Sequence, residues 1–80
     1  MRLEDDDLTW DGLDGAIVGR VGRCAGPDDV LCYDYDKMVE IFVTRDGMTH
    51  EEAAEWVDFN IVGAYIGERT PFVLFREVGE

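Results

Sequence analysis

The chain has 80 residues, of which 46% are hydrophobic, and 19 acidic side chains against 7 basic ones give a formal charge of −12. This charge excludes ordinary nucleic-acid binding, which needs a basic surface, and the apolar content excludes a disordered acidic tail. No apolar stretch approaches the roughly 18 residues of a membrane span, and the acidic N-terminus differs from a signal peptide. We therefore expect a soluble cytoplasmic protein without membrane contact, with a polar, acidic segment at 1–12 and a single domain at 13–80.

The N-terminal segment carries a run of three carboxylates, Asp5, Asp6 and Asp7. Such a charge run is most often solvated, so we expect it to be mobile and accessible to a partner. The apolar side chains of Leu8 and Trp10, by contrast, are expected to fold back onto the core.

The segment at 13–24 fits two structures. Leu13, Ile17, Val21 and Cys24 recur at helical spacing, whereas Ile17 and Val21 also alternate around Gly19 as they would in a strand. We favour a short, weak helix here. Three glycines would then lie on its outer face, each at a cost of about 1 kcal/mol relative to alanine.

Two apolar runs predict strands. The run at 30–33 follows a Gly-Pro turn signal, and the run at 72–75 follows a proline that forces an extended backbone. Between them, Asp34 is a suitable N-cap for a helix over 35–46, where apolar residues recur at helical spacing.

The clearest local signal is a capping box, in which Thr49 and Glu52 each satisfy the other's backbone N–H. Gly47 suits the left-handed residue that ends a preceding helix. We expect the central helix of the fold at about 51–66, terminated by Gly67. Its predicted core face comprises Ala53, Trp56, Val57, Asn60, Ile61 and Ala64.

Together these elements predict an α+β fold in which two short strands pack against two or three helices. Because Asn60 falls on the apolar face of the central helix, we expect it to be buried. A buried amide needs hydrogen-bond partners, so Asn60 is expected to tie the helix to a strand edge or a loop.

The second half of the central helix is apolar nearly all round, because Phe59, Val62 and Ile66 lie opposite its core face. Such a half is either sandwiched inside the fold or covered by a partner. The second case predicts a homo-oligomer, such as a homodimer, with these three side chains in the contact.

Three carboxylates, Glu51, Glu55 and Asp58, share the outer face of the first half. Helical neighbours three or four residues apart stand about 5–6 Å from each other, on a scale similar to that of phosphates along one DNA strand. A stiff row of carboxylates can therefore imitate a nucleic-acid backbone to a basic cleft. We predict that a partner protein binds this row and the run at 5–7, and the alternative is a solvated face.

Asp34 and Asp36 directly follow a predicted strand. This arrangement is similar to the aspartate pair of haloacid-dehalogenase-type phosphatases, in which one carboxylate is the nucleophile and the other a proton donor. Helix capping explains both aspartates, and the chain has no room for the rest of such a fold. A small hydrolase is therefore the least favoured alternative, and we predict that the protein is not an enzyme and has no catalytic residue.

Cys24, Cys32 and His50 are one ligand short of a four-ligand zinc site and lack paired C-x-x-C spacing. Free buried thiols are the simpler interpretation, and His50 is expected to be exposed at the start of the central helix. We predict no metal and no cofactor.

A colinear set of short motifs covers more than half of the chain: Tyr33-Asp34-Tyr35-Asp36-Lys37, Arg45-Asp46-Gly47-Met48-Thr49, Glu51-Glu52-Ala53, Phe59-Asn60, Gly63-Ala64-Tyr65, Gly67-Glu68 and Thr70-Pro71. In these motifs the stretch at 30–75 resembles a group of small, mostly uncharacterised proteins encoded by bacteriophages and prophages. The resemblance implies a phage origin and a compact α+β fold, and it implies no activity.

Small, strongly acidic phage proteins often resemble inhibitors of host nucleic-acid machinery, an analogy of charge and context. We therefore predict a non-enzymatic protein that blocks a basic, nucleic-acid-binding site on a host protein, for example in a CRISPR or other defence system. It would act in the host cytoplasm and would not bind nucleic acid itself. The alternative is a structural or assembly role as a homo-oligomer.

Overall fold

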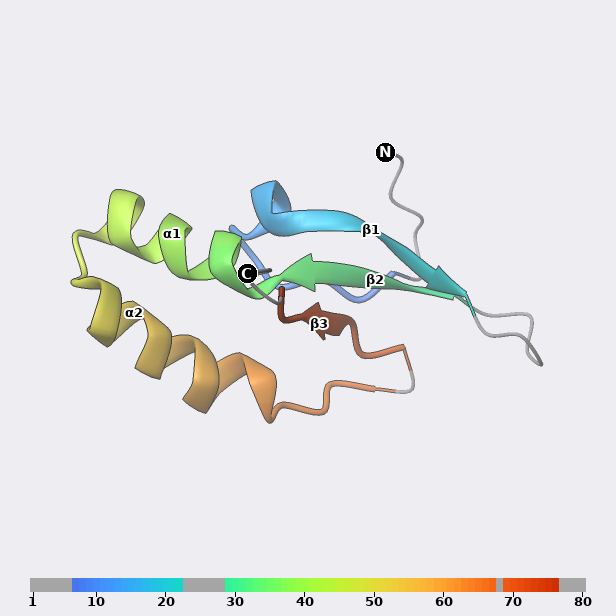
Figure 1. The fold of residues 1–80 in the computed structure, drawn as a ribbon. Coiled ribbons are helices and arrows are strands. Elements are labelled where there is room, and N and C mark those ends of the chain that lie inside the picture. The colour runs from blue at the N-terminus through green and yellow to red at the C-terminus, as the bar shows by residue number, and fades with distance from the viewer. Residues whose placement is uncertain (1–6, 23–28, 68, 77–80) are drawn as a thin grey trace.

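The computed structural model of the chain describes residues 7–22, 29–67 and 69–76. Within these residues it contains three strands and two α-helices, which confirms the predicted α+β fold with one strand more than expected. Figure 1 shows the sheet on one side and the two helices extending beyond the end of its central strand. In chain order the elements are η1 (Asp14–Ala16), β1 (Ile17–Gly22), β2 (Asp29–Asp34), α1 (Tyr35–Asp46), α2 (His50–Val57), η2 (Asp58–Val62) and β3 (Phe72–Leu74).

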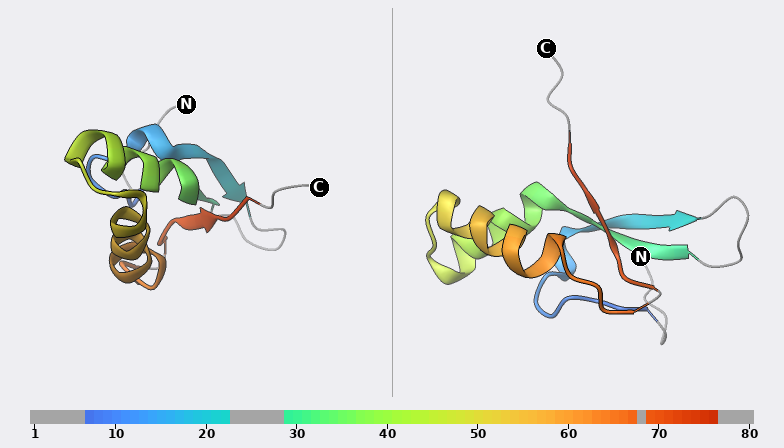
Figure 2. Two further views of the ribbon diagram at one scale, coloured as in Figure 1. Left: turned by 60° about the vertical axis from the view of Figure 1, so that its left-hand side comes forward. Right: turned by 90° about the horizontal axis from the view of Figure 1, so that it is seen from below.

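The sheet has the order β1-β2-β3, with β1 antiparallel and β3 parallel to β2. The central strand β2 is buried along nearly its whole length. The register between β1 and β2 shifts between Ile17 and Gly19, as at a β-bulge. The right-hand view of Figure 2 places the helices at one end of the molecule and β1 and β2 at the other.

The predicted helix at 13–24 is wrong. The chain makes a single 3₁₀ turn, η1, and then the strand β1. The turn buries Leu13 and Ala16, and the strand gains a backbone ladder with β2. Glycine weakens the interior of a strand about as much as that of a helix, so the pairing with β2 accounts for the strand. Cys24 lies outside the described residues.

The predicted helix at 35–46 is confirmed as α1. The Asp34 side chain caps it by accepting a hydrogen bond from the Lys37 amide at 3.1 Å. At its other end Gly47 has a φ of 73°, a left-handed conformation that glycine adopts without strain. The buried face of α1 comprises Met38, Val39 and Phe42.

The capping box of α2 is present as predicted. The Glu52 amide donates to the Thr49 hydroxyl at 3.1 Å, and the Thr49 amide donates to the Glu52 carboxylate at 3.0 Å. The helix nevertheless ends earlier than expected, because α2 passes into the π-helical turn η2 and stops at Val62. Beyond it the Thr70 hydroxyl accepts a hydrogen bond from the Ile66 amide at 3.0 Å, so that Ile66 belongs to a turn that leads into β3.

Asn60 is exposed, so its predicted burial is wrong. Its side-chain amide donates to the Trp56 carbonyl at 3.0 Å, within the same helix. The cause is η2, because a π turn has more residues per turn than an α-helix and rotates the side chains within and after it. Ile61 remains in the core, whereas Asn60 turns outward.

One hydrophobic core joins the sheet to the helices. The Trp10 ring packs edge-on against Tyr33 at a centroid distance of 4.9 Å, and the Trp10 amide donates to the Tyr33 hydroxyl at 3.0 Å. The end of the N-terminal segment therefore folds back onto the core, as predicted for Trp10. The buried cluster comprises Leu13, Ala16, Leu31, Tyr33, Met38, Val39, Phe42, Ala53, Val57 and Ile61.

Candidate functional site

The carboxylates of Glu51, Glu55 and Asp58, here called the acidic row, are all exposed along α2 and the start of η2. Their helix is held in place from the other side, where Ala53 and Val57 are completely buried. Figure 1 shows α2 and η2 as one continuous coil. The three residue positions of the row are thus fixed relative to one another by a capped and packed helix.

Asp58 at the end of the row is also fixed by its side chain. The Tyr35 hydroxyl donates to its carboxylate at 2.8 Å, which connects the start of α1 to the junction of α2 and η2. Burial, together with this hydrogen bond and the charge of Asp58, raises the pKa of Tyr35 to about 12. The neutral phenol therefore persists at physiological pH, where it remains the hydrogen-bond donor to Asp58.

Every arginine within the described residues is engaged by an aspartate: Arg20 and Arg69 by Asp7, Arg45 by Asp46, and Arg76 by Asp34. In the same part of the chain no basic side chain forms an ion pair with the acidic row. These four arginines are therefore already engaged in ion pairs within the protein. Within the described residues no ion pair neutralises the row, whose three carboxylates are exposed to solvent.

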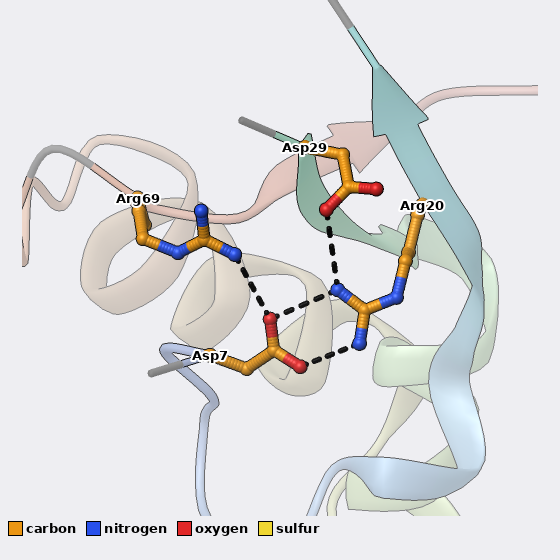
Figure 3. A network of polar contacts seen from close by, with 4 residues as sticks. All are labelled: Asp7, Arg20, Asp29 and Arg69. Atoms are coloured by element: carbon orange, nitrogen blue, oxygen red, sulfur yellow. Dashed lines mark hydrogen bonds and ion pairs between the residues drawn. The ribbon is translucent and has the colours of Figure 1, made fainter. Parts of the chain in front are cut away.

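Asp7 is not the mobile, solvated residue that we expected, since its side chain is only 1% exposed. Figure 3 shows its carboxylate between two guanidinium groups, at 2.6 and 3.0 Å from Arg20 and 3.2 Å from Arg69. Arg20 also reaches Asp29 at 3.5 Å. Two cations can compensate the loss of hydration that burial of one carboxylate costs, so Asp7 serves the fold. Asp5 and Asp6 lie outside the described residues.

The predicted apolar contact residues Phe59, Val62 and Ile66 are all exposed to solvent. Phe59, with 90% of its surface accessible, decides between the two expectations for this half of the helix. It is not sandwiched inside the fold, so that expectation is wrong. The exposed side chains thus change from acidic in α2 to apolar in η2 and the turn after it. We call Phe59, Val62 and Ile66 the apolar end.

Asp34 and Asp36 differ in their exposure to solvent. Asp36 is exposed, whereas the Asp34 side chain is 1% exposed and accepts hydrogen bonds from the Lys37 amide and the Arg76 side chain. Burial raises the pKa of the Asp34 carboxyl, but these hydrogen bonds outweigh it and hold the pKa below its ordinary value. Both Asp34 oxygens are thus occupied by structural partners.

Of the three side chains considered for a metal site, Cys24 lies outside the described residues, and Cys32 and His50 lie on different elements. Cys32 is buried in β2, where burial and the charge of Asp34 raise the pKa of its thiol. His50 is exposed at the first residue of α2. Among the described residues no three histidine, cysteine or acidic side chains are arranged to hold a metal ion.

A groove that the sequence did not reveal lies beside the acidic row. It has a volume of about 430 Å³ and is formed by the end of the N-terminal segment, the end of α1, and α2 with η2. We call it the aromatic groove, and its lining is Trp10, Asp11, Leu13, Phe42, Arg45, Asp46, Trp56, Asn60 and Ile61. Its two tryptophans are far apart in the sequence, so no local pattern could have joined them.

Arg45 closes one side of the aromatic groove by donating to the Gly12 carbonyl at 2.9 Å. Gly12 has a φ of 78°, and a Cβ placed there would lie 2.6 Å from the Arg45 guanidinium. Glycine is therefore required at this position for both the backbone conformation and the close approach. The contact joins the N-terminal segment to the C-terminal end of α1.

No protein family, no curated protein and no solved structure matches this chain. The resemblance to small phage proteins therefore stays a prediction from sequence motifs. Among the described residues no helix is both long enough and apolar enough to cross a membrane.

Proposed function

We propose that the protein is a non-enzymatic binding protein whose acidic row occupies a basic, nucleic-acid-binding surface of another protein. The observation that carries the proposal is that Glu51, Glu55 and Asp58 are exposed on a rigid helix while the described arginines are paired elsewhere. A chain of net charge −12 is attracted to a basic surface over several ångströms of solvent.

The fixed geometry of the row supports binding more than the charge alone does. Side chains on a preformed helix lose less conformational entropy on contact than charges on a flexible segment. The apolar end begins at Phe59, directly after Asp58 in the chain, so a partner can meet carboxylates and a hydrophobic contact together. Interfaces commonly combine a desolvated apolar centre with a polar rim.

The resemblance to phage and prophage proteins supports a specific setting for this proposal. The partner would be a host protein that handles nucleic acid, such as a component of a CRISPR or other defence system. By filling the basic site, the protein would prevent nucleic acid from binding there.

Charge reversal tests the role of the acidic row. A variant with Glu51, Glu55 and Asp58 all changed to lysine should lose the partner that the wild-type protein captures from host lysate. Its fold should survive, because exposed substitutions are usually mild. A second variant that reverses only Glu51 and Glu55 keeps the Tyr35–Asp58 hydrogen bond and should also bind much more weakly.

The matched control reverses three exposed carboxylates on other elements, Asp14, Asp36 and Glu40. It changes the net charge by the same amount and should retain most of the binding. Circular dichroism checks that all variants are folded. Equal losses in the two triple variants would mean that total charge, and not the acidic row, governs binding.

Self-association is a second candidate function, and the 90% exposure of Phe59 is the observation that favours it. A homo-oligomer would cover the apolar end and would give the protein a structural or assembly role. Residues 59–67 contain no charged side chain, so two copies could meet there with little direct repulsion between like charges.

Molecular mass measured by light scattering tests self-association. A dimer should become a folded monomer in Phe59→Asp, while Val18→Asp, at an exposed position on β1, should leave the mass unchanged. Salt should strengthen self-association because it screens repulsion between two acidic chains. The same salt should weaken binding to a basic partner, so the two candidates respond in opposite directions.

A further inference from the structure

The aromatic groove combines an apolar floor with two tryptophans. Its floor is formed by Leu13, Phe42 and Ile61, all of which are buried. Trp10 and Trp56 line the groove from distant parts of the sequence. Trp56 remains 41% exposed, and the centroid of its ring lies 4.7 Å from the centroid of the Phe42 ring. Tryptophan at a concave, partly exposed site is typical of the residues that contribute most to binding energy.

The polar lining of the groove carries a net negative charge. Asp46 binds the Arg45 guanidinium through two hydrogen bonds, at 3.0 and 3.1 Å, and so neutralises it. Asp11, the other carboxylate in the lining, is exposed and forms no ion pair with any basic side chain of the described residues. A cation that enters near Asp11 therefore gains an unneutralised partner.

The groove already contains one contact between a cation and an aromatic ring. The Arg45 guanidinium lies over the Phe42 ring at 5.3 Å from its centroid, within the range of cation–π attraction. Asn60 uses its amide nitrogen to donate to the Trp56 carbonyl. Its amide oxygen is consequently left as a hydrogen-bond acceptor for a ligand at the same place.

We propose that the aromatic groove receives one arginine side chain of the protein partner. A guanidinium is planar, stacks on aromatic rings and donates several hydrogen bonds in one plane, which suits Trp56, Asp11 and the Asn60 oxygen together. This inference rests on the proposed function, because it takes the partner to be basic. It adds a specific anchoring pocket next to the acidic row, on the flank of the same helix.

The protein's own fluorescence can test this pocket, because the chain has two tryptophans and both line the groove. The probe is N-acetyl-arginine amide, and its neutral isostere N-acetyl-citrulline amide is the matched control ligand. The arginine probe should give a saturable change in tryptophan fluorescence, with a dissociation constant in the millimolar range expected of one side chain. Citrulline should bind roughly tenfold more weakly, as expected when a charged hydrogen-bonding group is removed.

Variants test whether the fluorescence change arises from binding in the groove. Asp11→Asn should weaken the arginine probe roughly tenfold, whereas Asp14→Asn, at another exposed carboxylate outside the groove, should not. Reversal of Glu51 and Glu55 should leave binding of the probe largely intact, so failure of the acidic row and failure of the groove can be distinguished. Equal binding of arginine and citrulline, no saturable response, or an Asp11→Asn titration identical to wild type would each overturn the proposal.

Discussion

At the scale of single residues, the charged side chain of Asp7 is buried in ion pairs and is not presented at the surface. Its carboxylate is buried between the guanidinium groups of Arg20 and Arg69, which come from β1 and from the segment before β3. Three distant parts of the chain therefore meet at one side chain. An 80-residue domain has a small core, so the loss of one partner from such a buried ion pair should be costly.

Asp7→Asn should destabilise the protein by about 3–5 kcal/mol, because it removes the buried negative charge that two partly buried arginines share. Urea denaturation gives the free energy of unfolding. The control is Asp46→Asn, which breaks the exposed pair with Arg45 and should change stability little. Similar midpoints for wild type and Asp7→Asn would show that the buried ion pairs do not stabilise the fold.

Tyr35 makes stability depend on alkaline pH. Its pKa is raised from 10.0 to about 12, first by burial and then by the hydrogen bond to Asp58. A pKa that is higher in the folded state stabilises the protein fully below the unfolded value, and this stabilisation is lost as the pH rises toward the folded value. The free energy of unfolding should therefore fall between about pH 10 and pH 12.

Tyr35→Phe should weaken this dependence and should cost about 1 kcal/mol at neutral pH, as the loss of one hydrogen bond does. Tyr65→Phe is the control, since that ring is exposed in the segment after η2. Tyrosinate absorbance during a pH titration follows the ionisation directly. A Tyr35→Phe variant with an unaltered alkaline stability profile would contradict the assignment to Tyr35.

At the scale of elements, the capping box is the best-defined helix start in the chain. Thr49→Ala removes the side-chain acceptor of the Glu52 amide and should cost about 1 kcal/mol. Thr44→Ala is a matched control within α1, where the hydroxyl donates to the Glu40 carbonyl one turn back and caps no helix end. Thermal or urea unfolding that shifts equally in the two variants would mean that the cap contributes nothing specific.

The elements that the sequence predicted correctly are those with local causes. The Asp34 cap, the Thr49 capping box and the left-handed Gly47 each act within a few residues, so they can be recognised in the sequence. The segment at 13–24 could not be assigned in this way. Its pattern suits both a helix and a strand, and pairing with β2, a distant partner, decides between them.

The π turn η2 is the element that most affects the exposed face. A regular helix to residue 66 would have placed Asn60 in the core, whereas η2 directs it outward and ends the helix at Val62. Helical periodicity cannot predict such a turn, because the periodicity assumes a constant 3.6 residues per turn, which a π turn does not have. Phe59 lies within η2 and is the most exposed apolar side chain of this region, and π turns are frequent at functional sites.

At the scale of the whole molecule, the described arginines are paired within the protein, whereas the acidic row has no ion-pair partner among the described residues. The described arginines form ion pairs with aspartates, while Glu51, Glu55 and Asp58 face solvent. Helical spacing predicted that these three would share an exposed face, and it also predicted the apolar end. It could not predict the aromatic groove, because that site joins the N-terminal segment to α1 and α2 through tertiary packing.

The central claim is that the acidic row fills a nucleic-acid-binding site, and a competition measurement tests it most directly. The purified partner is saturated with its DNA or RNA, and the wild-type protein or one of the two triple charge-reversal variants is titrated in while bound nucleic acid is monitored. The wild type and the control variant reversed at Asp14, Asp36 and Glu40 should displace the nucleic acid, more weakly as salt increases. The variant reversed at Glu51, Glu55 and Asp58 should not. Binding of the wild-type protein while the nucleic acid stays bound, or equal displacement by the row variant, would contradict the claim.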